Sequence, residues 1–400
     1  MLINLRTRCG LEVHMRSYLT TYLLFVICLA AYPCILSAQS VMPAFLEGRV
    51  VDAETGTPLR GAHVFLSGTQ IGTVTNPSGR FQLNRIPAGS HRLVVSIIGY
   101  ERDPVDIIFR AGEHKNVYKR LKPVVYELDE IYAGNLDNRW ERHLDRFKRL
   151  FLGESTMADS TTIINPEVLR FESRWWGRFT AEALAPLQIE NRAMGYRITY
   201  YLDEFFHSGS RTRWTGDRHF VELPPADSTQ AAYWKENREK AFEGSLRHFF
   251  LSLMDHRLSA EGFLLYSQRQ SVHGDFRRNT FRTNPERIIQ ETGDERFFVL
   301  NFPGRLEIIY TEQGEDSRYP RWNRTITRGP ARVQTSYLQL NKRPITIDPN
   351  GEIVETYGAT RFGYYSFQRV ADKTPKDYLP EETSLITLTQ INSDQIPENN

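Results

Sequence analysis

The sequence predicts a β-rich protein of two domains: an N-terminal β-sandwich, then a connector helix and an α+β domain. Three observations lead to this fold class. Residues 45–121 form short apolar and polar alternations with turns at close spacing, which is typical of a sandwich. Residues 137–152 change to helical periodicity. The rest of the chain mixes strand-like runs with two helical segments, which favours an α+β domain.

The predicted sandwich consists of short strands separated by turns. Side chains alternate between apolar and polar through 62–66 and 105–109, and residues 92–98 are mostly β-branched and apolar, as in a central strand. Gly, Pro and Asn lie between these runs, and their backbone preferences suit a chain reversal. We predict a structural role in turns for these residues: Gly56, Pro58, Gly61, Asn76, Gly79, Pro87, Gly89 and Gly99.

The stretch from Gly48 to Tyr100 resembles the carboxypeptidase-regulatory-like (transthyretin-like) domain. It contains a G-x-V-x-D opening that ends at Asp52, a TGTPL turn, a GT-x-T-N-x-x-G-x-F block that ends at Phe81, and a closing I-G-Y. Members of that family are seven-stranded sandwiches found ahead of TonB-dependent outer-membrane receptors and beside metallocarboxypeptidase catalytic domains. The resemblance implies such a sandwich over residues 44–134, in a Gram-negative envelope protein.

Residues 1–38 have the layout of a secretory signal peptide. Basic residues precede an apolar run at 19–31, and the small pair Ser37-Ala38 follows. The run is short for a membrane span, so we expect cleavage and export to the periplasm, the outer membrane or the outside. Either Met1 or Met15 fits as the start. All three cysteines lie in this segment, so the exported chain would have none, unless Cys34 is lipidated: Cys9, Cys28 and Cys34.

The charge balance of the expected exported chain excludes some partners. Three of the 50 basic residues and one of the 48 acidic residues lie in residues 1–38, which leaves 47 of each. A balanced chain has no long-range attraction to nucleic acid, so we predict no nucleic-acid partner. No second apolar run is long enough for a transmembrane helix.

Residues 135–159 are predicted to be a connector, and 160–400 the α+β domain. Trp140, Leu144, Phe147 and Phe151 have the spacing of an amphipathic helix that ends at Gly153. In the second domain a helix pair is expected, one helix capped by Asp227 and running to 240, and the other at 243–256. The predicted strands, in a mostly antiparallel sheet, are 170–176, 193–202, 262–268, 296–300, 305–311, 336–341 and a hairpin of 344–347 with 352–354.

The second region also resembles a known kind of chain. Residues 186–206, 238–253 and 362–372 are similar to the uncharacterised partner regions that follow the same N-terminal domain in chains without a receptor barrel. No activity is assigned to those regions. The resemblance therefore implies an envelope protein and contributes no catalytic residue.

Catalytic motifs are incomplete. A metallocarboxypeptidase needs a His-x-x-Glu pair and a distant second histidine around Zn²⁺. His219 and Glu222 have this spacing, but the later histidines lie too close in sequence to be the third ligand: His248, His256 and His273. The strings at 207–210 and 243–246 lack the second half of the G-x-S-x-G motif, and Ser245 is better interpreted as a helix-initiating residue. We therefore predict no catalytic residue, no metal and no cofactor.

The aromatic and arginine clusters each allow two interpretations. Four tryptophans could form a stacking platform, but we favour an ordinary core role for them: Trp175, Trp176, Trp214 and Trp234. The arginines of 277–278 and 318–328 could bind an anionic polymer, but we favour a solvated face. The predicted function is a non-catalytic envelope binding or scaffolding protein whose partner is another envelope protein or a polysaccharide. The alternative is an envelope hydrolase of peptide or glycan that uses carboxylates of residues 160–400. The oligomeric state stays open.

Overall fold

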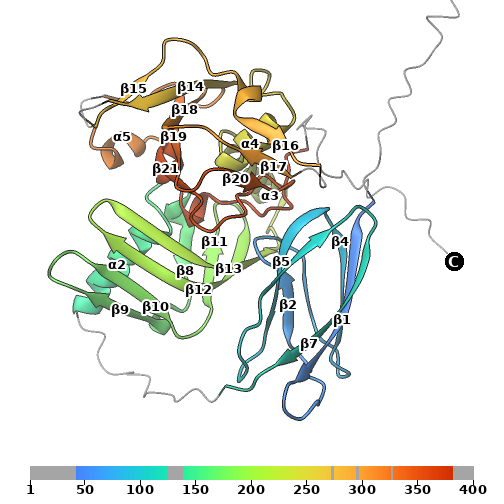
Figure 1. Ribbon diagram of the computed structural model, residues 1–400. Coiled ribbons are helices and arrows are strands. Elements are labelled where there is room, and N and C mark those ends of the chain that lie inside the picture. Colours follow the sequence, from blue (N-terminus) through green and yellow to red (C-terminus); the bar gives the residue numbers. More distant parts are fainter. Residues whose placement is uncertain (1–41, 125–137, 272–273, 294–296, 326–327, 382–400) are drawn as a thin grey trace, which may run out of the picture. The chain divides into compact units, whose positions relative to one another are not determined.

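The computed structural model describes residues 42–124, 138–271, 274–293, 297–325 and 328–381 (Figure 1). The predicted signal peptide, its three cysteines, the boundary between the sandwich and the connector, and the segment 382–400 lie outside the described residues. Among the described helices, none combines the length and the apolar character that a membrane crossing requires.

The N-terminal region is a seven-stranded β-sandwich, as predicted. One sheet has the order β4-β1-β7 and the other has the order β3-β2-β5-β6. β1 pairs with β4 in antiparallel and with β7 in parallel orientation. The strands are β1 (Ala44–Asp52), β2 (His63–Leu66), β3 (Gly72–Val74), β4 (Arg80–Ile86), β5 (Gly89–Ser96), β6 (Val105–Phe109) and β7 (His114–Leu121).

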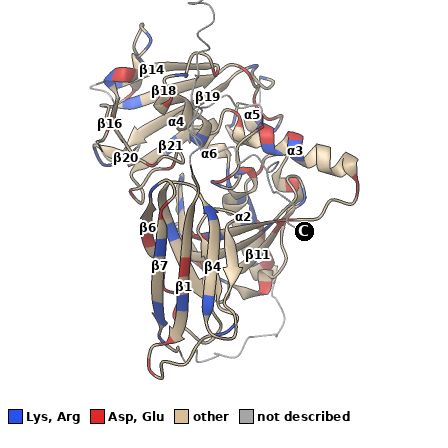
Figure 2. Ribbon diagram, turned by 90° about the vertical axis from the view of Figure 1, so that its right-hand side faces the viewer, with Lys and Arg blue, Asp and Glu red and all other residues tan. Residues whose placement is uncertain are grey.

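Alternation along the strands builds the sandwich core. In β4, Phe81, Leu83 and Ile86 are buried while the residues between them are exposed. These side chains meet the buried residues of β2 and β5 on the facing sheet, such as Val64 and Leu93. On the outer face, basic and acidic residues are interspersed along β1 and its neighbours, which agrees with the balanced charge of the sequence (Figure 2).

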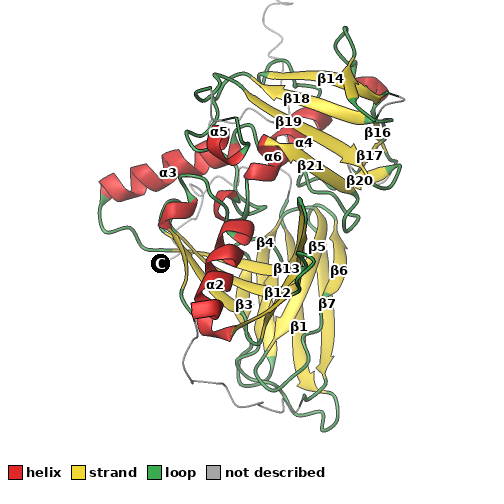
Figure 3. Ribbon diagram, turned by 90° about the vertical axis from the view of Figure 1, so that its left-hand side faces the viewer, coloured by secondary structure: helices red, strands yellow, loops and turns green. Residues whose placement is uncertain are grey.

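Helix α2 (Asn138–Phe151) covers one face of the next sheet (Figure 3). Its apolar stripe Leu144, Phe147 and Phe151 is buried in the same core as the strands, as the helical spacing predicts. The sheet has the order β8-β11-β12-β10-β9, with β13 paired to β12. Its strands are β8 (Thr161–Ile163), β9 (Leu169–Ser173), β10 (Phe179–Ala183), β11 (Leu187–Asn191), β12 (Tyr196–Ser208) and β13 (Arg211–Glu222).

The predicted helix pair precedes a further sheet. Helices α3 (Ser228–Phe242) and α4 (Leu246–Met254) come first, and α4 is buried along nearly its whole length. One sheet then has the order β15-β14-β18-β19-β21, and a small one the order β16-β17-β20. The remaining elements are β14 (Phe263–Gln270), β15 (Phe276–Arg278), β16 (Ile289–Glu291), β17 (Phe298–Leu300), β18 (Arg305–Tyr310), α5 (Tyr319–Trp322), β19 (Gln334–Leu340), β20 (Ile345–Ile347), β21 (Ala359–Gly363) and α6 (Tyr364–Phe367).

The second region contains more sheets than the one expected. Every strand pair described between 138 and 381 is antiparallel, as predicted, but β8–β13 and β14–β21 bury two separate apolar cores. Strand periodicity does not reveal this division, since residues in either sheet alternate in the same way.

Several element boundaries differ from the prediction for local reasons. The strand expected at 170–176 ends at Ser173, because residues 174–178 form the turn into β10. The strand expected at 193–202 begins at Tyr196 and continues to Ser208. The expected strand 352–354 is reduced to a single bridge between Ile347 and Ile353.

Candidate functional site

Backbone hydrogen bonds join the sandwich to the second region. The turn between β2 and β3 lies against β13, where Gly68 N donates to Arg218 O over 2.6 Å and Phe220 N donates to Thr69 O over 3.0 Å. On its other side, Lys376 N donates to Gly68 O over 2.8 Å. The turn is therefore held between two segments of the second region by backbone groups, which every substitution other than proline retains.

A buried carboxylate adds charge to this interface. Asp217 of β13 is 2% exposed, and the Nε atoms of Arg92 and Arg102 lie 3.1 and 3.8 Å from its oxygens. Burial raises the pKa of Asp217, and the two guanidinium groups oppose that shift. Both arginines belong to the sandwich, so this ion-pair group fixes the two regions together.

His219, the histidine of the His-x-x-Glu pair, packs in the same interface. Its ring centroid lies 4.9 Å from that of His63 and 5.3 Å from that of Phe65. Burial lowers the pKa of His219 to about 4. A Cβ at Gly72 would lie 2.4 Å from His219 Nε2, so the absence of a side chain at Gly72 makes room for the imidazole.

The residues with the spacing of a zinc site, His219 and Glu222, do not converge on one point with a later histidine. His219 and Glu222 are three residues apart on β13, and their side chains therefore project from opposite faces of the strand. Glu222 instead pairs with Arg238 over 3.0 Å, and His248 is buried against Phe242 and Phe263. Within the described ranges, no three His, Cys, Asp or Glu side chains are grouped as metal ligands would be.

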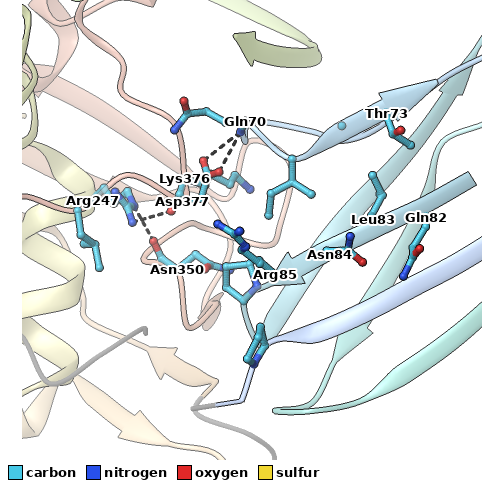
Figure 4. Close-up of a pocket in the computed structure, with 15 residues that line it drawn as sticks. Gln70, Thr73, Gln82, Leu83, Asn84, Arg85, Arg247, Asn350, Lys376 and Asp377 are labelled. Atoms are coloured by element: carbon cyan, nitrogen blue, oxygen red, sulfur yellow. Dashed lines mark hydrogen bonds between the residues drawn. The ribbon is translucent and has the colours of Figure 1, made fainter. Parts of the chain in front are cut away.

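A cavity of about 540 Å³ lies beside this interface (Figure 4). One wall comes from the sandwich, through β3, β4 and the turn before β3, and the other comes from α4, the β20 turn and the segment after Pro375. The lining residues are Pro43, Gln70, Ile71, Gly72, Thr73, Gln82, Leu83, Asn84, Arg85, Pro87, Arg247, Asn350, Lys376, Asp377 and Leu379.

A β-bulge brings Arg85 to the cavity. The register of β1 and β4 pairs Leu46 with Leu83 and Ala44 with Ile86, so β4 holds one extra residue between these pairs. Arg85 has a φ of 57°, a left-handed conformation that usually belongs to glycine in such a bulge. The bulge re-aims its side chain, which points from the sandwich toward residues 376–377 (Figure 4).

Arg247 of α4 also lines the cavity. Its guanidinium donates to the carbonyl oxygens of Asn350, Lys376 and Tyr378 over 2.9, 2.6 and 2.6 Å. These bonds use three of its five N–H donors, one on each nitrogen, and fix two loops of the second region. Arg247 is therefore a structural residue of the site.

Asp377 is the one carboxylic acid among the residues that line the cavity. Both of its carboxylate oxygens accept from Gln70 N at 3.1 Å. Burial raises the pKa of this carboxyl group to about 6. Glycosidic hydrolysis uses a pair of carboxyl groups, and the described lining supplies only one.

The remaining charges of the lining are cationic. Arg85 is exposed, and Lys376 lies in the opposite wall. Amide residues surround them, namely Gln70, Gln82, Asn84 and Asn350. Two cations among amides suit a ligand that carries an anionic group and further hydrogen-bonding groups.

The residues expected in turns lie between strands, except Gly89, which is the first residue of β5, and some of them lie next to this cavity. The five predicted glycines all have positive φ: 71° at Gly56, 76° at Gly61, 71° at Gly79, 130° at Gly89 and 85° at Gly99. Asn76 closes its turn by accepting from Ser78 N and Arg80 N, and Pro58 bridges to Val51. Pro87 lines the cavity, and a Cβ at Gly89 would lie 2.9 Å from Asn350 Nδ2.

The sequence motifs did not point to the cavity. Arg85, Lys376 and Asp377 lie outside every motif of the sequence, and Asn350 lies in the turn of the predicted hairpin of 344–347 with 352–354. The available signal was indirect: Pro87 and Gly89, two expected turn residues that follow Arg85, mark the end of β4, where the bulge re-aims the side chain.

Two of the four singled-out tryptophans are core residues and two are not. Trp234 is buried and donates from Nε1 to Arg192 O, and Trp214 packs partly buried against the α2 core. Trp175 and Trp176 are 91% and 56% exposed, against our expectation of a core role.

The arginine-rich segments are engaged within the protein. Arg278 lies 3.5 Å from Glu307 and over the ring of Tyr266. In the second segment, Arg318 pairs with Asp159, and Arg328 pairs with Glu315 over 2.8 Å. This arrangement agrees with the interpretation as solvated, ion-paired faces.

The family resemblance of the first domain is confirmed. Residues 46–132 match the family model described as the CarboxypepD_reg-like domain, which is a non-catalytic domain type. TonB-dependent receptor P39 of Formosa agariphila is 38% identical over 96 residues, which are 24% of this chain and 8% of the receptor. The chain thus spans less than a tenth of the length of that curated relative.

Two solved structures resemble the chain over a similar share of its length. Klebsiella pneumoniae 5-hydroxyisourate hydrolase is 24% identical, with a TM-score of 0.18, and the match covers 20% of this chain and 92% of that one. BcpA, the major pilin subunit of Bacillus cereus, is 13% identical, with a TM-score of 0.19, and the match covers 21% and 31%.

Proposed function

We propose that this chain is a non-catalytic binding or scaffolding protein of the Gram-negative cell envelope, exported by its N-terminal segment. Its partner is another envelope protein or a polysaccharide, and the cavity between the sandwich and the second region is the binding site. The relation of the first domain to a TonB-dependent receptor supports the envelope location.

The observation that carries this proposal is the composition of the cavity. Arg85 from the sandwich and Lys376 from the second region face one space among four amide residues, with a single carboxyl group already engaged by Gln70 N. Such a lining recognises anionic and hydroxyl-rich groups by charge-assisted hydrogen bonds. The backbone bonds at 68, 69 and 376 hold the two walls in place, so the site is largely formed before a ligand arrives.

Site-specific crosslinking in living cells tests the proposal. A photoreactive amino acid at Gln82, in the cavity wall, should capture a neighbour, whereas the same amino acid at Ile108 on β6 should not. Mass spectrometry then identifies a protein adduct, and glycosidase digestion reveals a polysaccharide adduct. Envelope molecules are the expected neighbours, and recovery of cytoplasmic proteins alone would contradict the proposal.

Matched variants test the role of the cavity. Arg85→Ala and Lys376→Gln should each weaken the adduct at least about tenfold if each removes a charge-assisted bond of about 1.5–3 kcal/mol. Arg60→Ala removes an exposed arginine of the same sandwich outside the cavity and should leave the adduct unchanged. Equal adduct yield in all three variants would exclude the cavity as the binding site.

A hydrolase is the second candidate, and the raised pKa of Asp377 is the observation in its favour. A carboxyl group with a pKa of about 6 can serve as a proton donor or acceptor near neutral pH. If the wild-type protein turns over the captured ligand and Asp377→Asn does not, the protein is a hydrolase and the non-catalytic proposal is wrong. Binding without turnover, retained in Asp377→Asn, is the result that we expect.

A further inference from the structure

The turn between β9 and β10 exposes two neighbouring tryptophans on the surface. Residues 172–178 are all exposed, and a Cβ at Gly177 would meet no atom within 4 Å. Trp175 and Trp176 therefore project from the sheet end into solvent. Two exposed indoles cost solvation free energy unless they meet another surface, because each is a large apolar group.

Hydrogen bonds fix the conformation of this turn. Arg174 N donates to Arg178 O over 2.8 Å, and Gly177 N donates to Arg174 O over 3.0 Å. Gly177 has a φ of 90°, which closes the turn without strain. The two indoles are thus presented by a built turn and need little ordering before they bind.

The geometry of the pair does not suit stacking on a sugar. The ring planes of Trp175 and Trp176 meet at 83°, with centroids 5.5 Å apart, so they do not form one flat platform. None of the residues of this turn lines the cavity described above, and none lines a second cavity of about 540 Å³ beside β14. Two indoles at nearly right angles on a projecting turn instead suit insertion into a fluid surface, such as a lipid interface, that can surround both side chains.

Arginines surround the tip. Arg178 and Arg146 lie over the rings of Phe206 and Phe179, with 5.8 and 4.6 Å from each guanidinium carbon to the ring centre. Neither forms an ion pair within the part of the chain that the structure describes. Arg174 pairs with Glu172, and Arg211 is exposed at the adjoining end of the β12–β13 hairpin.

We propose that the β9–β10 tip binds the surface of a lipid bilayer that contains anionic phospholipids. Trp175 and Trp176 enter the interfacial region, where indole is favoured because its ring is apolar and its N–H can meet polar headgroups. Arg178, Arg146 and Arg211 lie at the level of the phosphates and complement their charge. The tip is a different site from the cavity. A failure of membrane binding at the tip would therefore leave ligand binding in the cavity untouched, and the reverse also holds.

Vesicle flotation tests this inference. The full-length gene product is purified in whatever processed form the host yields, so that its N-terminal segment is the same in every variant. The vesicles are phosphatidylcholine alone or phosphatidylcholine mixed with phosphatidylglycerol. The wild-type protein should float with the phosphatidylglycerol vesicles, and its tryptophan emission should shift to shorter wavelength.

Variants of the tip and matched controls give the decisive comparison. Trp175→Ala/Trp176→Ala should lose roughly tenfold or more in affinity and the emission shift. Arg178→Gln should lose about fivefold, and only on anionic vesicles. Ile98→Ala, which removes a 98% exposed apolar side chain from the β5–β6 loop, should bind as the wild type does.

Three outcomes would overturn the inference. The first is an absence of wild-type binding to the phosphatidylglycerol vesicles, and the second is equal binding by the double tryptophan variant. The third is protection of the indoles from an aqueous quencher by a soluble polysaccharide or a protein and not by vesicles. Circular dichroism of the double variant should match that of the wild type, because the two indoles contribute little to the core.

Discussion

Arg85 has a strained backbone conformation that places its guanidinium group at the cavity. Its left-handed φ of 57° costs an ordinary side chain about 1–2 kcal/mol, and the bulge that imposes this φ also directs the guanidinium at the cavity. Glycine would relieve the strain but would remove the cation. Strained residues of this kind concentrate at functional sites, which agrees with a binding role for the cavity.

We expect Arg85→Gly to be more stable than Arg85→Ala by about 1 kcal/mol, because alanine keeps the strained φ and glycine does not. Thermal and urea denaturation of the two variants measure the difference. Both variants should lose the crosslink at the cavity. A more stable alanine variant would show that the position is unstrained.

His91 makes the sandwich sensitive to acid. Burial lowers the pKa of His91 from 6.5 to about 4 in the folded protein, where Nε2 lies 2.8 Å from Pro87 O. Between those two values the unfolded chain binds a proton that the folded chain does not bind. The free energy of unfolding should therefore fall as the pH drops through this window, by on the order of 3 kcal/mol for this residue.

His91→Gln should flatten that pH dependence, since the amide can donate to Pro87 O and does not titrate in this range. Urea denaturation at a series of pH values from 7 to 4 measures the slope. The other buried histidines, His219 and His248, add to this slope, whereas Asp372 and Asp377, whose pKa burial raises to about 6, oppose it. Asn116→Ala, at an exposed residue of β7 that does not titrate, is the control and should keep the wild-type slope. An unchanged slope in His91→Gln would contradict the prediction.

At the scale of an element, α4 shows that residues next to the helix determine where it begins. The amphipathic pattern predicted a helix from 243, but α4 begins at Leu246. Gly244 has a φ of 66°, which a helix cannot contain, and Ser245 accepts from His248 N over 3.1 Å as the N-cap. Apolar periodicity finds the buried face, whereas the cap determines where the helix starts.

Loss of this cap should destabilise the second region. Ser245→Ala should cost about 1 kcal/mol, and Ser245→Gly only a few tenths, because glycine tolerates the N-cap conformation. The control is Ser228→Ala, one position inside the cap of α3, which should change stability little. Chemical denaturation followed by circular dichroism checks the order, and an alanine variant as stable as the wild type would mean that the cap bond contributes nothing.

Elements were more predictable than their assembly, for a physical reason. The alternation of β4 and the helical spacing of α2 depend on neighbours a few residues away, so the sequence shows them directly. The cavity depends on Arg85, Asn350 and Lys376, which are far apart in sequence and meet only through the interface. The bulge that directs Arg85 follows from the register of β1 against β4, and periodicity alone does not specify that register.

At the scale of the whole molecule, the fit of His219 over Gly72 couples the sandwich to the second region. A Cβ on Gly72 would lie 2.4 Å from the imidazole, so Gly72→Ala must displace the interface. We expect calorimetry to show the sandwich unfolding separately, at a lower temperature than in the wild type. Isolated domains with few shared contacts unfold independently.

Two further variants make this prediction specific. Gly72→Ala/His219→Ala removes the contact with the imidazole, leaves one of 3.1 Å to Phe65 Cβ, and should restore much of the coupling. Gly293→Ala adds a methyl group where no atom lies within 4 Å and should have no effect on the transitions. A single transition at the wild-type temperature in Gly72→Ala would show that the interface tolerates the methyl group.

The parallel pairing of β1 with β7 has a mechanical consequence. The ladder runs from Phe45 beside His114 to Asp52 beside Leu121, so the chain enters the sandwich at one end of the ladder and leaves it at the other. A pull on the two ends loads this ladder along its length, and its hydrogen bonds share the force and must break together. A hairpin under the same load would unzip one bond at a time. The sandwich is thus a link that resists stretching along the chain.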